Sequence, residues 1–212
     1  MEKKHNINTL YPVILSVPPD YEKLKMRAKV RFLSQYARQA LIISEQLSFN
    51  SRNIDNCLQT SGTLPKDENS APMPVNGCFW SVTHKPAYAG GVVSCKPAGF
   101  DIEKIKEYTK GLRRKIADNK EWSLVDPEKL ESFFRYWTAK EAVLKAAGVG
   151  LSELSKCRIA GIIDDFHLKI LFKNQIWIAE HFYFNDHMAS IVKNDFQVIW
   201  KKPVVSLWLN SC

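Results

Sequence analysis

A chain of 212 residues, 45% of them hydrophobic and 11% aromatic, can bury a sizeable core, which excludes a wholly disordered protein. The formal net charge of +8 calls for an anionic partner or a solvated basic surface. The sequence contains no zinc-finger spacing, no RNA-binding aromatic signature and no obvious helix-turn-helix, so we expect no nucleic-acid partner.

Composition also bears on the compartment. No apolar run approaches the roughly 18 residues that a membrane span needs, and residues 1–10 lack the apolar centre of a signal peptide. The five cysteines are scattered and form no CxxC pair, which argues against a disulfide framework or a zinc site and for a reducing compartment. We therefore expect a cytoplasmic protein with no membrane partner.

The first half of the chain is expected to contain a strand, a helix and then further strands. Val30, Leu33 and Leu41 fit a helical pattern, which predicts a helix that carries Arg38. His84 then lies at a strand end or in the turn that follows. The expected elements are a strand at 10–17, a helix at 29–47, a loop at 50–76 and strands at 78–82 and 89–94.

The second half repeats this order, which suggests an α+β protein with two similar lobes. The expected elements are a strand at 99–103, a basic helix at 107–119, a helix at 126–147 and strands at 158–163, 167–172, 176–184 and 188–192. The tail at 196–212 is apolar, and we expect it to cover the core.

One position in the helix at 126–147 does not suit a buried stripe. Asp126 is a natural N-cap and Gly148 a natural stop, and apolar residues between them recur at spacings of three, four and seven. Glu141 falls within this stripe, four residues before Lys145. A buried carboxylate costs several kcal/mol unless a lysine or a metal pairs with it. The alternative is that Glu141 and Lys145 form an ordinary ion pair on a solvated helix face, which would stabilise the helix by about 0.3 kcal/mol.

A second acidic site lies in the strand at 99–103. Asp101 and Glu103 alternate with Phe100 and Ile102, so period two places both carboxylates on one face and the apolar pair on the other. Carboxylates from a strand and a helix make an oxygen-rich site of the kind that Mg²⁺ prefers, with remaining ligands from water and a substrate's phosphates. The two acidic segments together predict a metal and phosphate site.

These segments, in this order, resemble motifs of the 4′-phosphopantetheinyl transferases. GFDIE at 99–103 and WTAKEA at 137–142, followed by Lys145, resemble the paired signature of that family. WSVTHK at 80–85 resembles its Ser/Thr-His motif, at the expected distance before the acidic strand. Weaker likenesses lie at 38–41 and 187–190.

The resemblance implies a fold and an activity. The longer, surfactin-synthetase-activating members are single-chain pseudo-dimers of two similar α/β lobes, which here correspond to residues 1–97 and 98–212, with the metal site in the second. Such an enzyme, a holo-acyl-carrier-protein synthase, moves the 4′-phosphopantetheine arm of coenzyme A to a carrier-protein serine and releases adenosine 3′,5′-bisphosphate. The implied partners are coenzyme A and an acidic apo-carrier protein, and the implied state is a monomer.

The resemblance also assigns roles to single residues. Asp101, Glu103 and Glu141 would hold Mg²⁺, for which Mn²⁺ can substitute. Glu141, Lys145 and His84 are the expected catalytic residues, with Glu141 the candidate acceptor of the serine proton. The residues expected to bind coenzyme A are Arg38, Thr83, His84, Lys85, Lys140 and Lys145.

The chain departs from the family pattern at two places. Many members carry Gly-Lys-Pro before the His motif, whereas this chain has Ala71 in place of that lysine. Lys66 and Lys85 are both candidates to compensate. Phe100 stands where a small aliphatic residue is usual, and we expect it to alter packing rather than chemistry.

Two other classes of function stay open at this point. A binding module could hold coenzyme A or an acidic protein without turnover, although it would not need a third carboxylate near a pyrophosphate. A basic nucleic-acid binder is the third choice. The basic residues Lys110, Arg113, Arg114 and Lys115 lie between the acidic strand and the acidic helix, where we expect them to steer an acidic carrier or to form a solvated face.

Overall fold

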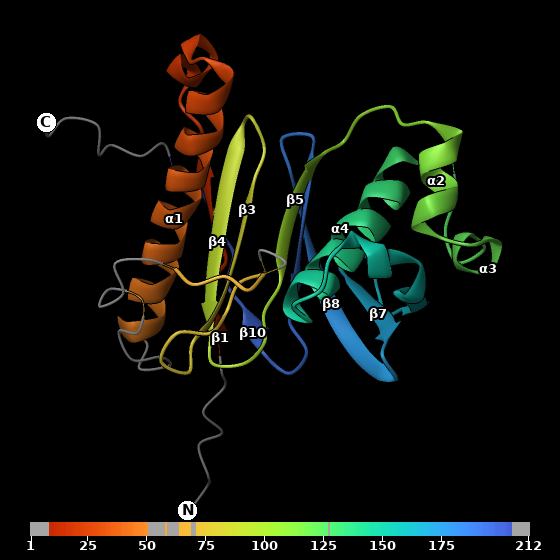
Figure 1. Cartoon of the computed structure of the whole chain (residues 1–212). Helices are drawn as coiled ribbons and strands as arrows, with labels where there is room; N and C mark the ends of the chain where they lie inside the picture. The colour runs from red at the N-terminus through yellow and green to blue at the C-terminus, as the bar shows by residue number, and fades with distance from the viewer. Residues whose placement is uncertain (1–8, 51–57, 59–63, 69–70, 127, 205–212) are drawn as a thin grey trace, which may run out of the picture.

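The computed structural model describes residues 9–50, 58, 64–68, 71–126 and 128–204 (Figure 1). Its helices and strands form a mixed α+β fold with two main sheets, which confirms the predicted fold class. In the described part of the chain, no helix is long and apolar enough to cross a membrane.

The first sheet is covered by one long helix, α1 (Met26–Asn50). Its strand order is β11-β2-β4-β3, made by β2 (Val13–Ser16), β3 (Phe79–His84), β4 (Tyr88–Ser94) and β11 (Lys201–Val204). The helix lies close to the sheet because Gly91 has no side chain: a Cβ there would be 2.5 Å from the backbone nitrogen of Leu41. Small residues therefore set the distance between helix and sheet in this half.

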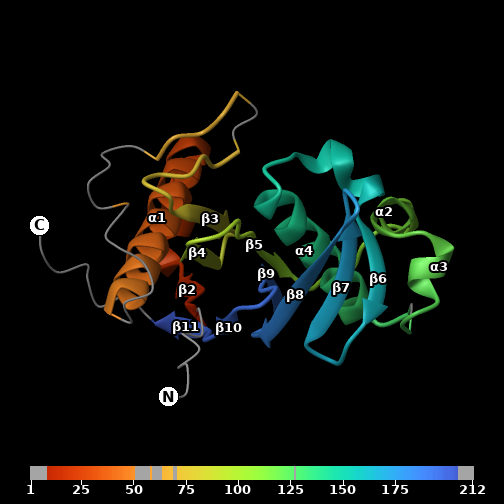
Figure 2. The same cartoon turned by 90° about the horizontal axis from the view of Figure 1, so that it is seen from below.

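The second sheet is antiparallel and packs against α4 (Leu130–Ala146). Its strand order is β5-β9-β8-β7-β6, made by β5 (Phe100–Lys104), β6 (Arg158–Ile162), β7 (His167–Phe172), β8 (Gln175–Phe184) and β9 (His187–Val192). The α4 residues Phe133, Tyr136 and Leu144 are buried in the core between helix and sheet. Figure 2 shows α1 beside β3 and β4, α4 beside β7 and β8, and β5 between the two halves.

Shorter elements complete the chain. The two-stranded sheet pairs β1 (Thr9–Leu10) with β10 (Gln197–Val198) in parallel. The remaining helices are η1 (Pro19–Lys23), α2 (Lys110–Ile116), α3 (Asn119–Trp122) and η2 (Leu151–Lys156).

The strand predictions are confirmed within a few residues, but the bounds of two predicted helices are wrong. The helix expected at 107–119 spans only Lys110–Ile116, and a separate helix, α3, follows because the Asp118 carboxylate accepts a hydrogen bond from Glu121 N. The expected helix from Asp126 begins only at Leu130, because Asp126 Oδ1 instead accepts a hydrogen bond from Glu128 N in the preceding turn.

The cysteines differ in part from the expectation. Cys78 is disulfide-bonded, whereas the buried Cys157 and the exposed Cys95 are free. The remaining two, Cys57 and Cys212, lie outside the described residues.

Each half contains a sheet and one long helix, as expected, but the C-terminal segment crosses between them. After β9 the chain returns to the first half, where β10 pairs with β1 and β11 pairs with β2. The strands within residues 197–204 therefore belong to sheets of the first half. The expected division at residue 97 had assigned these residues to the second lobe. The pseudo-dimeric relation of the halves stays a prediction.

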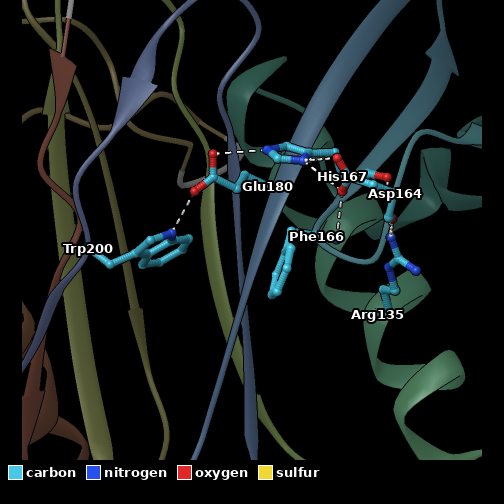
Figure 3. Close-up of polar contacts among 6 residues, drawn as sticks. All are labelled: Arg135, Asp164, Phe166, His167, Glu180 and Trp200. Carbon is cyan, nitrogen blue, oxygen red and sulfur yellow. Dashed lines mark hydrogen bonds and ion pairs between the residues drawn. The ribbon is translucent and has the colours of Figure 1, made fainter.

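Trp200, between β10 and β11, connects this returning segment to the second sheet through contacts with β8 (Figure 3). Its indole stacks on Phe182 with ring centroids 5.3 Å apart, and its Nε1 donates to Glu180 Oε1 at 2.8 Å. The other Glu180 oxygen lies 3.2 Å from His167 Nε2, and His167 Nδ1 lies 2.8 Å from Asp164 Oδ1. Glu180 thus links the C-terminal segment to the β7 end of the sheet.

Gly99→Ala tests how closely α4 and β5 must approach. The added Cβ would lie 1.7 Å from the Ala142 carbonyl oxygen and 2.6 Å from Ala146 N, so the helix would have to shift. Overpacking usually costs about 1–3 kcal/mol, and we expect at least about 3 kcal/mol here because the contact is with backbone atoms. Urea denaturation measures the loss in free energy of unfolding.

Gly161→Ala is the matched control, since an added Cβ at this β6 position would meet nothing within 4 Å. It should change the free energy of unfolding by no more than about 1 kcal/mol. Equal effects of the two substitutions would contradict a close packing constraint at Gly99.

Candidate active site: carboxylates and lysines between the two sheets

Two carboxylates project from β5, as the alternation of its residues predicts. The apolar residues Phe100 and Ile102 are fully buried, and Asp101 and Glu103 point to the opposite face. Asp101 is only 3% exposed. The strand therefore presents one deeply buried acid and one partly buried acid, two residues apart.

Asp101 is held from both halves of the molecule. Its Oδ1 accepts hydrogen bonds from Lys145 Nζ at 2.7 Å and from Thr83 Oγ1 at 3.1 Å. Lys145 also donates to the Phe100 carbonyl at 3.0 Å, which fixes the ammonium beside the strand. Asp101 Oδ2 is buried and has no hydrogen-bond partner among the described residues. A buried oxygen without a partner is one that a bound cation or ligand could satisfy.

Glu103 forms an ion pair with Lys85, with Nζ and Oε1 2.6 Å apart. Burial raises the pKa of Glu103, and the hydrogen bond from Lys85 does not fully offset that effect. Burial lowers the pKa of Lys85, but the hydrogen bond and charge of Glu103, with the charges of Asp101 and Glu141, raise it overall. The lysine is therefore held as a cation against the acids.

Glu141 comes from α4, one turn before Lys145, and completes a cluster of three acids. Burial raises its pKa to about 7, and the negative charge of Asp101 adds to this effect while Lys145 opposes it. Since Glu103 also raises the pKa of Glu141, the three carboxylates lie within electrostatic reach of one another. Glu141 is thus part of an acidic cluster and is not a solvated residue on a helix surface.

An oxygen donor set of this kind fits a hard cation such as Mg²⁺. Among the described residues, however, no three acidic, histidine or cysteine side chains are already gathered as metal ligands. The reason lies in the ion pairs, since Lys145 holds Asp101 and Lys85 holds Glu103. The residues present fit a divalent cation in donor type, with Asp101 Oδ2 as a buried oxygen still to be satisfied.

The residues of the expected histidine motif divide between the interior and the surface. The Thr83 hydroxyl is buried and already bonded to Asp101, so it positions that acid. His84 lies exposed at the end of β3. Its partial burial lowers its pKa, and the positive charges of Lys145, Lys85 and Lys66 lower it further. A cationic environment therefore surrounds the imidazole.

Lys140 lies apart from the cluster, although it precedes Glu141 in sequence. It is 1% exposed and forms a buried ion pair with Glu121, with Nζ and Oε1 2.6 Å apart. Its Nζ also donates to the Ile116 carbonyl, and Glu121 accepts a hydrogen bond from Ile159 N. Lys140 therefore lies inside the protein, where it joins α4 to the α2–α3 region. The sequence had instead predicted that it contacts coenzyme A.

Arg38 also lies outside the cluster of contacts described above. It is exposed on α1, whose neighbouring residues Ala37 and Leu41 face the first sheet. The structure thus brings together Thr83, His84, Lys85, Asp101, Glu103, Glu141 and Lys145, but neither Lys140 nor Arg38 has a recorded contact with them.

Sequence reasoning missed the residues that hold β5 and α4 in place. Ser81 Oγ accepts a hydrogen bond from Phe100 N at 3.0 Å, and Thr83 Oγ1 accepts one from Ile102 N at 3.3 Å. The alternation of Ser81 and Thr83 on one strand face was the available signal.

A second polar contact that the sequence did not reveal joins α4 to β9. Thr138 Oγ1 lies 2.5 Å from Ser190 Oγ, which in turn lies 2.7 Å from His181 Nδ1. Burial lowers the pKa of His181 well below its ordinary value, so the imidazole stays neutral. Since Ser190 is the register partner of Asp101, this contact sets α4 against the acidic strand.

Comparisons with known proteins show what the segment that carries the acids resembles. Residues 97–198 match the model of the 4′-phosphopantetheinyl transferase superfamily, and the matched segment contains Asp101, Glu103, Glu141 and Lys145. This segment is therefore similar to that superfamily.

Several curated transferases are similar to the chain over part of their length. The 4′-phosphopantetheinyl transferase HetI of Nostoc sp. is 33% identical over 92 residues, 40% of this chain and 39% of the relative. The transferase ffp of Bacillus subtilis is 30% identical over 117 residues, 52% of this chain and 49% of the relative. The L-aminoadipate-semialdehyde dehydrogenase-phosphopantetheinyl transferase of Schizosaccharomyces pombe is 35% identical over 63 residues, 29% of this chain and 22% of the relative. The matches thus span less than half of each relative.

Lys140→Met tests whether Lys140 stabilises the fold or binds coenzyme A. The substitution leaves Glu121 buried without its cation, which typically costs about 3–5 kcal/mol. We expect a loss of that order in the free energy of unfolding by urea denaturation, and no change in coenzyme A affinity of the folded protein by calorimetry.

The double variant Lys140→Met with Glu121→Gln is the control, because it removes the uncompensated charge and should recover part of the lost stability. A Lys140→Met protein of unchanged stability and weakened coenzyme A binding would contradict the structural role.

Proposed function

We propose that the protein transfers the 4′-phosphopantetheine arm of coenzyme A to a serine of an apo-carrier protein and releases adenosine 3′,5′-bisphosphate. The observation that carries the proposal is the cluster of Asp101, Glu103 and Glu141 bordered by Lys85 and Lys145. All three acids and Lys145 fall within the segment matched to the superfamily. Membership of the longer pseudo-dimeric type, a monomeric state and a cytoplasmic location belong to the same proposal.

The proposed metal ligands are Asp101, Glu103 and Glu141. A bound Mg²⁺, or Mn²⁺ in its place, would supply positive charge that neutralises the pyrophosphate of coenzyme A. The unpartnered Asp101 Oδ2 supports this assignment, as does the electrostatic coupling of the three acids. Lys145 and Lys85 would then exchange their carboxylate partners for phosphate oxygens, since a lysine is a mobile point charge.

The chemical step needs a positioned nucleophile and a place for its proton. The carrier serine Oγ attacks the β-phosphorus of coenzyme A, and the bond from that phosphorus to the bridging oxygen breaks. The proton passes to Glu141, directly or through a water, and the α-phosphate leaves on adenosine 3′,5′-bisphosphate. Lys145 lies one helical turn from Glu141 and stabilises the charge that develops on the leaving phosphate.

The carrier is proposed to reach this cluster along α2. A cavity of about 360 Å³ extends from Glu103 to Leu112 of α2, with Tyr108, Phe133 and Trp137 among its lining residues. Beyond it, the α2 side chains Lys110, Arg114 and Lys115 are exposed. An exposed basic helix next to a cavity that opens from the acidic cluster suits an acidic carrier whose serine must come close to the carboxylates.

A single incubation tests the proposed activity. The protein is mixed with coenzyme A, Mg²⁺ and an apo-carrier protein, and the carrier is weighed by mass spectrometry. We expect a mass increase of one phosphopantetheine group, its loss after exhaustive chelation and its return with added Mg²⁺. Binding of coenzyme A without any modified carrier would favour a non-catalytic binding module.

Glu141→Gln provides the matched variant for the same assay, because the amide keeps the shape and loses the charge and basicity. We expect no modified carrier with Glu141→Gln and normal modification with Glu153→Gln, since Glu153 lies in η2 and pairs with Lys156 rather than with the lysines of the cluster. Thermal melts of both variants establish that they are folded. Normal turnover by Glu141→Gln would remove Glu141 from the chemical step.

Charge reversal on α2 tests the carrier path. Arg113 is unsuitable because its guanidinium packs over the Trp122 ring at 5.0 Å, so Lys110→Glu with Arg114→Glu is the better double variant. We expect the carrier KM to rise several-fold and the coenzyme A KM to stay within about twofold, since exposed charges act over about 8 Å at physiological salt.

The control is Lys169→Glu with Lys173→Glu, which changes the net charge equally at and beside β7. A similar rise in carrier KM for both double variants would mean that overall charge matters and α2 does not dock the carrier.

A further inference from the structure

A separate, smaller cavity is lined in part by Lys145. It has a volume of about 210 Å³ and is lined by the loop after α4, by Ser81 and Val82 of β3, and by Lys66, Ala71 and Pro72. Lys145 contributes to both this cavity and the acidic cluster. The cavity therefore shares one lysine with the proposed reaction site.

Lys66 is held at this cavity by a small hydrogen-bonded turn. Lys66 and Pro72 form an antiparallel bridge, and Met73 N donates to the Pro65 carbonyl at 3.0 Å. The indole of Trp80 on β3 donates to the Met73 carbonyl at 2.8 Å, which ties the turn to the first sheet. The backbone of Lys66 is thus fixed relative to β3.

The charges around His84 show that Lys66 joins two other lysines there. Lys85 and Lys145 are each paired with a β5 carboxylate. Among the described residues no ion pair is formed by Lys66, which is exposed. The three positive charges all act on His84, whose pKa they lower after the effect of burial. Lys66 is therefore a cation near the site that no described carboxylate neutralises in an ion pair.

The loop after α4 leaves space in the cavity and offers few donors of its own. Gly148 has a φ of +66°, and an added Cβ at Gly148 or Gly150 would meet nothing within 4 Å. The backbone N–H groups of Gly148 and Val149 are already used, since they donate to the Lys145 and Leu144 carbonyls. Lys66 and Lys145 are consequently the charged donors that an anion in this cavity would meet, beside the Ser81 hydroxyl.

We propose that Lys66 binds a terminal phosphate monoester in this cavity, namely the 3′-phosphate of coenzyme A. The assignment rests on the proposed function and adds a residue to it. A terminal phosphate carries a charge of about −1.5 to −2 and three free oxygens, which suits a lysine with no carboxylate partner. The pyrophosphate, which carries less charge on each phosphorus, is left to the acidic cluster and Lys145. Lys85, also expected to bind coenzyme A, differs from Lys66 in being paired with a carboxylate, that of Glu103.

Comparison of coenzyme A with dephospho-coenzyme A isolates this phosphate, because the two ligands differ only there. Binding of each to the folded protein is measured by calorimetry without carrier, so that no turnover is needed. We expect Lys66→Ala to weaken coenzyme A binding about tenfold and dephospho-coenzyme A binding by less than twofold. Lys66→Arg should recover most of the lost affinity, and Lys169→Ala on β7 should change neither ligand.

The other outcomes separate the subsite from the proposed function. Equal weakening of both ligands by Lys66→Ala, or no weakening of either, would overturn the assignment of Lys66 to the 3′-phosphate. A wild-type protein that prefers coenzyme A through Lys66 yet modifies no carrier would leave the subsite standing and remove the transferase activity. A wild-type protein that modifies the carrier but binds both ligands equally would remove the subsite alone.

Discussion

The two halves of the molecule meet where hydroxyl groups of β3 accept hydrogen bonds from backbone N–H groups of β5. The N–H groups of Phe100 and Ile102 point away from β9, and they donate to the hydroxyls of Ser81 and Thr83. An unsatisfied buried N–H costs about 1–3 kcal/mol, so these contacts fix the position of β5. Thr83 also holds Asp101, so the same hydroxyl that joins the two halves orients the central acid.

The position of α4 follows from a second constraint at the same strand. Gly99 lets the helix backbone approach the start of β5 more closely than any side chain would permit. Thr138 and Ser190 then join the helix to β9. With the helix held at that distance, Lys145 reaches Asp101 and Glu141 lies among the β5 acids. Lys145 and Lys85 pair with the β5 carboxylates, so the protein itself supplies positive charge that stabilises the buried acidic cluster.

Adjacent residues on α4 serve different purposes because successive helical positions point about 100° apart. Glu141 faces β5, whereas Lys140 points to the interior, where it joins Glu121. Strand alternation correctly placed Asp101 and Glu103 on one face of β5, and helical spacing placed Glu141 one turn before Lys145 on α4. The sequence leaves the metal and phosphate site itself a prediction. It did not distinguish Lys140 from Lys145, because the partner of a buried lysine comes from an element distant in sequence.

The sequence by itself determined the α+β class, the order of the strands along the chain and the face of β5 that carries Asp101 and Glu103. These features depend on local alternation and spacing, which neighbouring residues encode. Tertiary structure decided the return of β10 and β11 to the first half, the hydroxyl contacts of Ser81 and Thr83, and the place of Lys66 beside Lys145. Each of these joins residues far apart in the chain, and their pairing depends on which surfaces the packed core brings together.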